Sequence, residues 1–126
     1  MFSHVMLGVN DIDAAKQFYD AILGTIGYKP GIIDPKGRCM YVSDSGVFLL
    51  TKPINGEPAT HGNGSTMGFA VTSPEMADAW HQAGLNAGGS ACEDPPGVRE
   101  GGPMKLYLAY LRDPSGNKIC ALYRMP

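Results

Sequence analysis

The order of predicted elements repeats along this chain, and the repeat limits the folds that the chain can adopt. Apolar periodicity predicts a strand, a helix and three strands within residues 1–53, and the same order within residues 66–126. Residues 54–65 are rich in Gly, Pro and Asn, which indicates a linker. A shift of 62 positions (80 − 18) places Phe18 on Trp80 in the same register. The chain therefore reads as one domain of two related modules.

Both predicted helices have recognisable starts and one apolar face. The first helix covers Asp13–Thr25, with Asn10 or Asp11 as its N-cap. The second helix follows Ser73 as N-cap, with Pro74 at the first helical position. Because each helix has apolar residues at helical spacing, we expect each to cover one face of a sheet.

The remaining segments predict strands, turns and one long loop. Asp113–Asn117 joins two alternating runs and predicts the turn of a β-hairpin, since Gly and Asn tolerate positive φ. Glu93–Pro103 has three Pro and three Gly and predicts a loop. The predicted strands are Phe2–Val9, Tyr28–Ile33, Arg38–Ser43, Val47–Lys52, Thr66–Val71, Ser90–Cys92, Leu106–Leu111 and Lys118–Tyr123.

The fold class is α+β, with two βαβββ modules in tandem that form a cupped mixed sheet around one cavity. The helix-covered face of each strand must be apolar, so alternation assigns the opposite face to the cavity. In the last hairpin this places Leu106, Leu108 and Tyr110 against the helix, whereas Val47–Lys52 fits either orientation. The side chains predicted to face the cavity include His4, Met6, Thr66, Tyr107 and Cys120.

Composition excludes several classes of partner. A net charge of −2 without a basic patch argues against nucleic acid as a partner. No apolar run approaches about 20 residues, and the N-terminus lacks a signal-peptide pattern, so we expect no membrane partner and a cytoplasmic location. The three cysteines are odd in number and share no close spacing, which argues against disulfides and structural zinc.

The motifs resemble those of the vicinal oxygen chelate superfamily. The resemblance rests on His4-Val5, on the helix from Asp11 through Phe18-Tyr19, and above all on Asp113–Ile119 (DPSGNKI). This superfamily includes glyoxalase I, extradiol dioxygenases, fosfomycin-resistance transferases and bleomycin-binding proteins. The resemblance covers nearly the whole chain and implies the fold, but not a particular activity. It also implies a homodimer, because the family often pairs modules between chains.

The resemblance also implies four positions at which metal-using members hold a divalent cation. The first falls on His4, and its counterpart in the second module is Thr66, where a His would be expected. The family's Glu ligand falls on Cys120, and the matching position in the first hairpin is Leu50. Catalytic metals need about three protein ligands, and hard cations need carboxylates. We therefore expect no cofactor and only a vestigial position at His4, although His4 and Cys120 could weakly hold a soft metal.

Individual candidates have both a functional and an ordinary structural interpretation. His4 and Tyr107 are the candidate catalytic residues, yet a half-buried His and an aromatic cavity wall are common. Cys120 is a possible thiolate next to His4, but free Cys usually packs as a small hydrophobe. Arg99 lies in the loop that precedes the hairpin and is the one cation available to an anionic ligand. The candidate ligand-binding residues are Met6, Phe48, Leu50, Thr66, Arg99, Tyr107 and Cys120.

Three functional hypotheses follow. The first is a protein that binds or sequesters a small molecule in an apolar cavity, similar in kind to the bleomycin-binding branch. The second is a metal-dependent lyase or dioxygenase of glyoxalase type that uses ligands outside the mapped positions. The third is a metal-independent enzyme that uses His4, Tyr107 or Cys120. The missing metal ligands favour the first.

Overall fold

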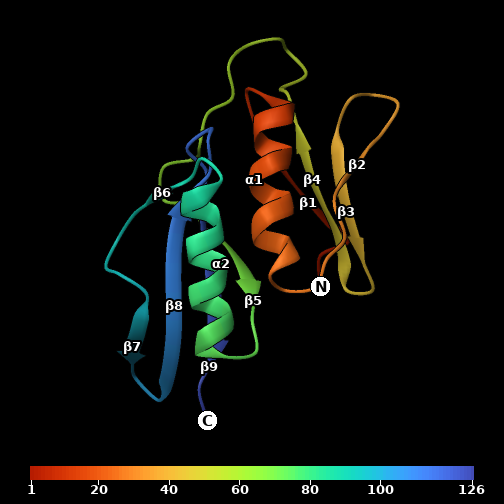
Figure 1. Cartoon of the computed structure of the whole chain (residues 1–126). Helices are drawn as coiled ribbons and strands as arrows, with labels where there is room; N and C mark the ends of the chain where they lie inside the picture. The colour runs from red at the N-terminus through yellow and green to blue at the C-terminus, as the bar shows by residue number, and fades with distance from the viewer.

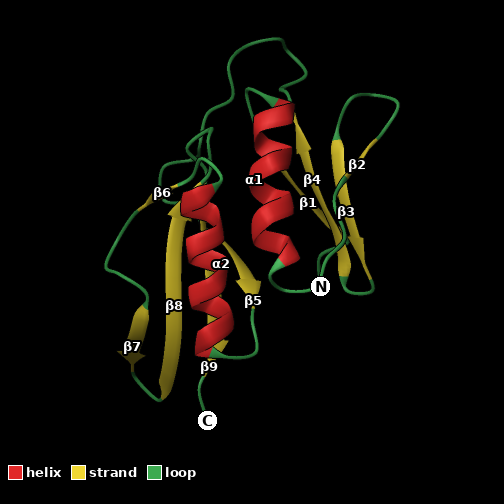
Figure 2. Cartoon of the chain, viewed as in Figure 1, coloured by secondary structure: helices red, strands yellow, loops and turns green.

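Two helices lie side by side in front of two separate sheets in the computed structural model, which describes all 126 residues (Figure 1). Each helix covers the sheet of its own module. The long linker has no helix or strand and appears as a loop at the top of Figure 2. The predicted tandem α+β arrangement is confirmed, although the strands form two sheets rather than one continuous sheet.

The first module contains a four-stranded sheet in the order β1-β4-β3-β2. β1 runs parallel to β4, and the other neighbours are antiparallel. The predicted strand at residues 28–33 is reduced to two residues, because only Ile32 and Ile33 pair with β3. The elements are β1 (His4–Gly8), α1 (Ile12–Gly24), β2 (Ile32–Ile33), β3 (Cys39–Ser43) and β4 (Gly46–Thr51).

The second module repeats this plan with one additional strand. Its sheet has the order β5-β9-β8-β6, and β7 also pairs with β8. The predicted loop at residues 93–103 is wrong in part, since β7 forms an antiparallel hairpin with β8 there. The elements are β5 (Met67–Ala70), α2 (Pro74–Asn86), β6 (Ser90–Ala91), β7 (Gly97–Gly101), β8 (Met104–Arg112) and β9 (Lys118–Arg124).

Both helices begin at the caps that the sequence predicts. The Ala14 N–H donates to Asp11 Oδ1 at 3.0 Å, and the Met76 N–H donates to Ser73 Oγ at 3.1 Å. Each bond satisfies one of the N–H groups that the first helical turn leaves free. Pro74 occupies the first turn, where its missing N–H costs nothing.

The modules are joined mainly by the contact between α1 and α2. The helices approach closely at Gly84, which is buried and lies against Ile22 and Phe18 of α1. A Cβ on Gly84 would lie 3.1 Å from Ile22 Cγ2 and 3.2 Å from Phe18 Cε1, and within overlap distance of Leu111 Cδ1. A glycine at this position therefore allows the core of 17 buried residues to be continuous across both modules.

The turn between β8 and β9 makes a second connection between the modules. Asp113 and Asn117 are buried, and Asp113 Oδ2 accepts bonds from the Tyr19 hydroxyl at 2.7 Å and from Asn117 Nδ2 at 2.9 Å. Asn117 Nδ2 also donates to the Gly8 carbonyl at the end of β1. The turn has positive φ only at Gly116 (92°). The motif that the sequence identifies as a turn therefore also anchors the second module to the first.

No helix of this chain is long and apolar enough to cross a membrane.

Candidate functional site

An apolar cavity lies in the seam between the two modules. The first strands β1 and β5 each have a partner on one side only, and their free edges face the same space. We call this space the seam cavity; its volume is about 250 Å³. It is lined by Phe2, Ser3, His4, Val5, Leu23, Tyr28, Tyr41, Ser43, Ser45, Gly46, Val47, Phe48, Met67, Gly68 and Phe69.

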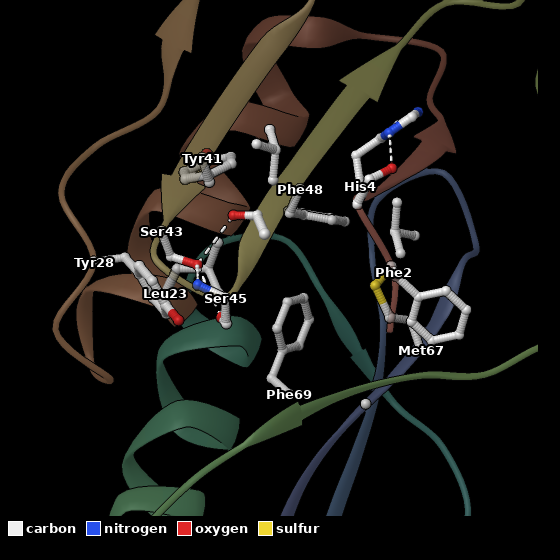
Figure 3. Close-up of a pocket in the computed structure, with 15 residues that line it drawn as sticks. Phe2, His4, Leu23, Tyr28, Tyr41, Ser43, Ser45, Phe48, Met67 and Phe69 are labelled. Carbon is white, nitrogen blue, oxygen red and sulfur yellow. Dashed lines mark hydrogen bonds between the residues drawn. The ribbon is translucent and has the colours of Figure 1, made fainter.

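Aromatic rings form much of the wall of the seam cavity. Phe48 of the first module and Phe69 of the second meet edge to face, with ring centroids 5.4 Å apart. Figure 3 shows the Phe69 ring pointing toward Phe48, with Phe2 beside Met67 on the opposite side. Phe2 is 70% exposed, so this large apolar side chain borders the cavity without being packed in the core. An exposed phenylalanine at a cavity rim is available for contact with an apolar ligand.

Polar groups lie at two places on the wall of the seam cavity. Ser3 Oγ and His4 Nδ1 share a hydrogen bond of 2.8 Å, with His4 exposed at the start of β1. Ser43 ends β3 and Ser45 lies in the turn to β4, where Ser43 Oγ donates to the Gly46 carbonyl at 3.0 Å (Figure 3). An apolar space with a few polar points at its rim is the usual form of a small-molecule site.

Tyr41 is fixed in the wall by its hydroxyl. The hydroxyl donates to Asp20 Oδ1 at 2.7 Å, and the Gly31 N–H donates to the same oxygen at 2.8 Å. Burial, together with hydrogen bonds to Asp20 and Cys39, raises the pKa of Tyr41 far above its ordinary value. The phenol is therefore a permanent donor to Asp20 and is not available as an acid or base for a ligand.

The prediction of which side chains face the helix is confirmed for β1 and β5. Val5 and Leu7 of β1 and Phe69 of β5 are more buried than the residues between them, while His4 and Met6 are exposed on the opposite face. Thr66 precedes β5 and is exposed. These are the faces that the sequence assigns to a ligand. The binding roles of Met6 and Thr66 remain predictions.

The face prediction is wrong for β8, and Tyr107 does not lie on the open face. Tyr107 pairs with Tyr123 and donates its hydroxyl to Asp78 of α2 at 2.7 Å, so it packs toward the helix. That bond and burial raise the pKa of Tyr107. Leu106, Leu108 and Tyr110 are on the open face instead, because Tyr110 pairs with Cys120. Tyr107 is therefore no longer a candidate for contact with a ligand on the open face.

The assignments on β4 also change. Leu50 pairs with Leu7 and is fully buried toward α1, so it does not lie on the open face, where the resemblance requires the counterpart of Cys120. The structural counterpart of Cys120 is Leu49, because Met6 pairs with Leu49 as Gly68 pairs with Cys120. Phe48 also faces the core, but its ring lines the seam cavity.

The four positions that would hold the family metal do not form a suitable donor set. They now comprise one imidazole (His4), one hydroxyl (Thr66), one thiol (Cys120) and the apolar Leu49. No group of three or more His, Cys, Asp or Glu side chains comes together in the structure. Hard cations require several oxygen ligands, and zinc requires about three strong donors besides an open position. These residues fit neither requirement.

Cys120 is buried on the open face of β9. Burial raises the pKa of its thiol to about 11, so the nucleophilic thiolate is scarce at neutral pH. The Cys120 Sγ also occupies the space beside Gly68, where an added Cβ would lie 3.2 Å away. Cys120 is therefore a packed small side chain, and its proposed activation by His4 has no support.

We expect iodoacetamide at pH 7.5 to modify Cys120 at least about 100-fold more slowly than it modifies glutathione, since each pKa unit reduces the thiolate about tenfold. Peptide mass spectrometry over a time course gives the rate at each cysteine. Cys92 is only partly buried and serves as the internal comparison, although burial raises its pKa as well. Labelling of Cys120 at the rate of glutathione would show an activated thiol and restore the enzyme hypothesis.

Arg99 lies in β7 rather than in a loop. It pairs with Leu106, which places it on the open face of the second sheet, and its guanidinium donates to the carbonyls of Asp94 and Pro95 at 3.0 Å each. It is not part of the seam cavity. Contact between Arg99 and an anionic ligand remains a prediction, and it applies to a ligand on the open face.

Sequence analysis missed most of the seam cavity. Phe2, Tyr28, Met67 and Phe69 were assigned to a strand end, a strand and a helix-covered face, and none was a candidate. One signal was available, because the first strand of each module has only one partner in this topology. In this structure the two edges border one space, which is the seam cavity.

The comparisons with known proteins agree with this fold. The family model of the Glyoxalase/Bleomycin resistance protein/Dioxygenase superfamily matches residues 1–121, and the chain belongs to this superfamily. A crystal structure of a glyoxalase/bleomycin resistance protein from Albidiferax ferrireducens T118 is 63% identical, with a TM-score of 0.95 over 98% of this chain and 99% of that one.

More distant structures share the fold alone. A glyoxalase/bleomycin resistance protein/dioxygenase family enzyme from Burkholderia phytofirmans PsJN is 18% identical, with a TM-score of 0.73 over 98% of both chains. A glyoxalase-related enzyme from Fulvimarina pelagi is also 18% identical, with a TM-score of 0.74 over 98% of this chain and 87% of that one. Among curated proteins, none matches this chain.

Proposed function

We propose that this protein binds a small, largely apolar molecule in the seam cavity and does so without a metal. The observation that carries the proposal is the cavity itself, a space of about 250 Å³ with nine hydrophobic residues among fifteen that line it. Small-molecule sites typically have volumes of about 300–1,000 Å³, and this cavity lies just below that range, so it suits a compact ligand of up to three rings. Burial of apolar surface there would provide most of the binding free energy.

The residues on the open face support binding rather than metal-assisted catalysis. The superfamily's metal chemistry requires a cation that binds two adjacent substrate oxygens, and the four mapped positions lack the carboxylates to hold one. Cys120, which has the chemistry of a nucleophile, is held in its protonated form by a raised pKa, and the Tyr41 hydroxyl in the seam cavity wall is engaged by Asp20. We assign Cys120 and Tyr41 a role in packing.

A fluorescent apolar ligand tests the proposal. N-phenyl-1-naphthylamine gains fluorescence in an apolar site, and the single Trp80, which lies beside Phe69, reports the same event from the protein side. We expect saturable binding that is unchanged after dialysis against EDTA. We also expect Ser45→Phe to raise the Kd at least about tenfold, a loss of about 1.4 kcal/mol, because the added ring occupies the cavity.

The matched control adds the same ring away from the cavity. Ile54 is fully exposed in the linker, so Ile54→Phe should leave the Kd within about twofold of the original value. Circular dichroism establishes that both variants are folded. Equal affinity of the Ser45→Phe variant and the unchanged protein would refute the proposed location, and loss of binding in EDTA would refute metal independence.

A further inference from the structure

The free edges of β1 and β5 present unpaired main-chain groups to the seam cavity. The Ser3 carbonyl accepts from the Val47 N–H, and the Val9 N–H donates to the Thr51 carbonyl, so the odd-numbered residues of β1 bond to β4. In a parallel pair, alternate residues direct their N–H and C=O to opposite sides. The main-chain groups of His4 and Met6 therefore point away from β4.

The Gly8 carbonyl confirms this direction. It is the next even-numbered group along β1, and it accepts a bond of 2.9 Å from Asn117 Nδ2 of the second module. At that end of the strand the free edge is thus already bonded across the seam. No side chain or strand makes such a bond to the His4 or Met6 main chain.

β5 has the same arrangement. The Val71 N–H donates to the Leu122 carbonyl, so the odd-numbered residues of β5 bond to β9 and Gly68 directs its N–H and C=O to the free edge. His4 and Gly68 both line the seam cavity, so two strand edges with free donors and acceptors border the same apolar space. In Figure 1, β5 runs in the direction opposite to β4. Because β1 is parallel to β4, the edges of β1 and β5 run in opposite directions.

We propose that the ligand class of this cavity is aromatic molecules that carry a secondary amide, such as acylated amino acid amides or short peptides. The inference rests on the proposed function and specifies the ligand. The ring would contact Phe2, Met67 and Phe69, and the amide would pair with the free edge as an added strand does. An amide supplies one donor and one acceptor at the spacing that a strand edge offers.

The residue types at the rim favour an uncharged amide over an anionic ligand. No Lys or Arg lines the seam cavity, and its polar side chains are three serines, two tyrosines and His4. A carboxylate or phosphate would lose hydration without a cationic partner. A neutral amide loses less hydration free energy, because its N–H and C=O would each pair with a main-chain group of the strand edge.

The test compares two ligands that differ in one donor. N-acetyl-L-phenylalanine N-methylamide and N-acetyl-L-phenylalanine methyl ester compete with N-phenyl-1-naphthylamine, and displacement gives their affinities. We expect the amide to bind about threefold to tenfold more tightly than the ester, which is the effect of one hydrogen bond. Equal affinities would overturn the inference while binding of the fluorescent probe leaves the proposed function intact. Absence of any probe binding would overturn both.

A proline at His4 tests the main-chain donor directly. His4 is the first residue of an edge strand and its N–H points away from β4, so proline removes that donor and leaves the ladder bonds in place. Relative to His4→Ala, which keeps the N–H, His4→Pro should weaken the amide ligand about threefold to tenfold. The affinity for N-phenyl-1-naphthylamine, which has no carbonyl, should be equal in the two variants. Equal amide affinity in both folded variants would refute the role of this donor.

Discussion

Gly84→Ala is expected to lower the free energy of unfolding, although alanine is the better helix former. An alanine in place of glycine inside a helix normally gains about 1 kcal/mol. At Gly84 the added methyl group would overlap Leu111 Cδ1 and would lie 3.1 Å from Ile22 Cγ2. Leu111 and Ile22 are fully buried, so neither can move without displacing the core, and overpacking costs about 1–3 kcal/mol.

The sign of the effect is tested against a second helical glycine. Gly24 ends α1, is exposed, and has no atom within 4 Å of the position of an added Cβ. Gly24→Ala should therefore raise the free energy of unfolding, whereas Gly84→Ala lowers it and Gly84→Val lowers it by about 3 kcal/mol or more. Urea unfolding followed by Trp80 fluorescence measures all three. If both alanine variants are stabilised, the helices are not closely packed at Gly84.

Asp113→Asn is expected to destabilise the protein by about 2–4 kcal/mol. The Asp113 carboxylate accepts four bonds: its Oδ2 from Tyr19 and from the Asn117 amide, and its Oδ1 from the N–H groups of Ser115 and Asn117. An amide NH₂ group in place of Oδ2 would be a donor facing two other donors, the Tyr19 hydroxyl and Asn117 Nδ2. Burial and the Asp113 charge raise the pKa of Tyr19 well above its ordinary value, so the phenol stays protonated and donates to the Asp113 carboxylate.

Two further variants identify why Asp113→Asn loses stability. Tyr19→Phe removes one donor and should cost about 1–2 kcal/mol, and its combination with Asp113→Asn should cost less than the sum, because one conflict is then absent. Asp44 occupies the turn between β3 and β4, is exposed, and makes no side-chain hydrogen bond, so Asp44→Asn should change stability by less than about 0.5 kcal/mol. Full additivity would show that Tyr19 and Asp113 act separately. The measurement is again urea unfolding.

The helices and their caps could be predicted because they depend on local sequence. Asp11 and Ser73 precede apolar residues at helical spacing, and both caps form as expected. The tandem plan followed from the same signals together with the repeated order of elements. The predicted strands were less accurate where few residues pair, as for β2, and where glycines conceal a hairpin, as for β7.

The orientation of β8 could not be read from its own alternation. Both of its alternating series are apolar, with Leu106, Leu108 and Tyr110 on one face and Tyr107, Ala109 and Leu111 on the other. The decisive constraint is non-local, since residues paired across an antiparallel ladder share a face. Tyr110 pairs with Cys120 across the five-residue loop 113–117, and this parity assigns Leu111 and Ile119 to the helix side. The length of that loop was the available signal.

The seam cavity depends on how two modules meet, which periodicity within one module does not describe. Sequence analysis placed the ligand on the open faces, where His4 and Cys120 lie. The structure adds a space at the strand edges that recruits Phe69 from the second module and Phe48 from the first. His4 belongs to both surfaces, and so it was the one catalytic candidate that remained relevant to a ligand.

The inward position of the β1 and β5 edges also affects how the protein behaves at high concentration. A long exposed strand edge is a template for sheet growth between molecules, and natural proteins shorten, charge or cover such edges. Here the β1 and β5 edges face each other, and the outer edge β2 has only two residues. The outer strand β7 presents Arg99 and Glu100 between glycines. The same geometry that leaves room for a ligand therefore also protects the chain from edge-to-edge aggregation.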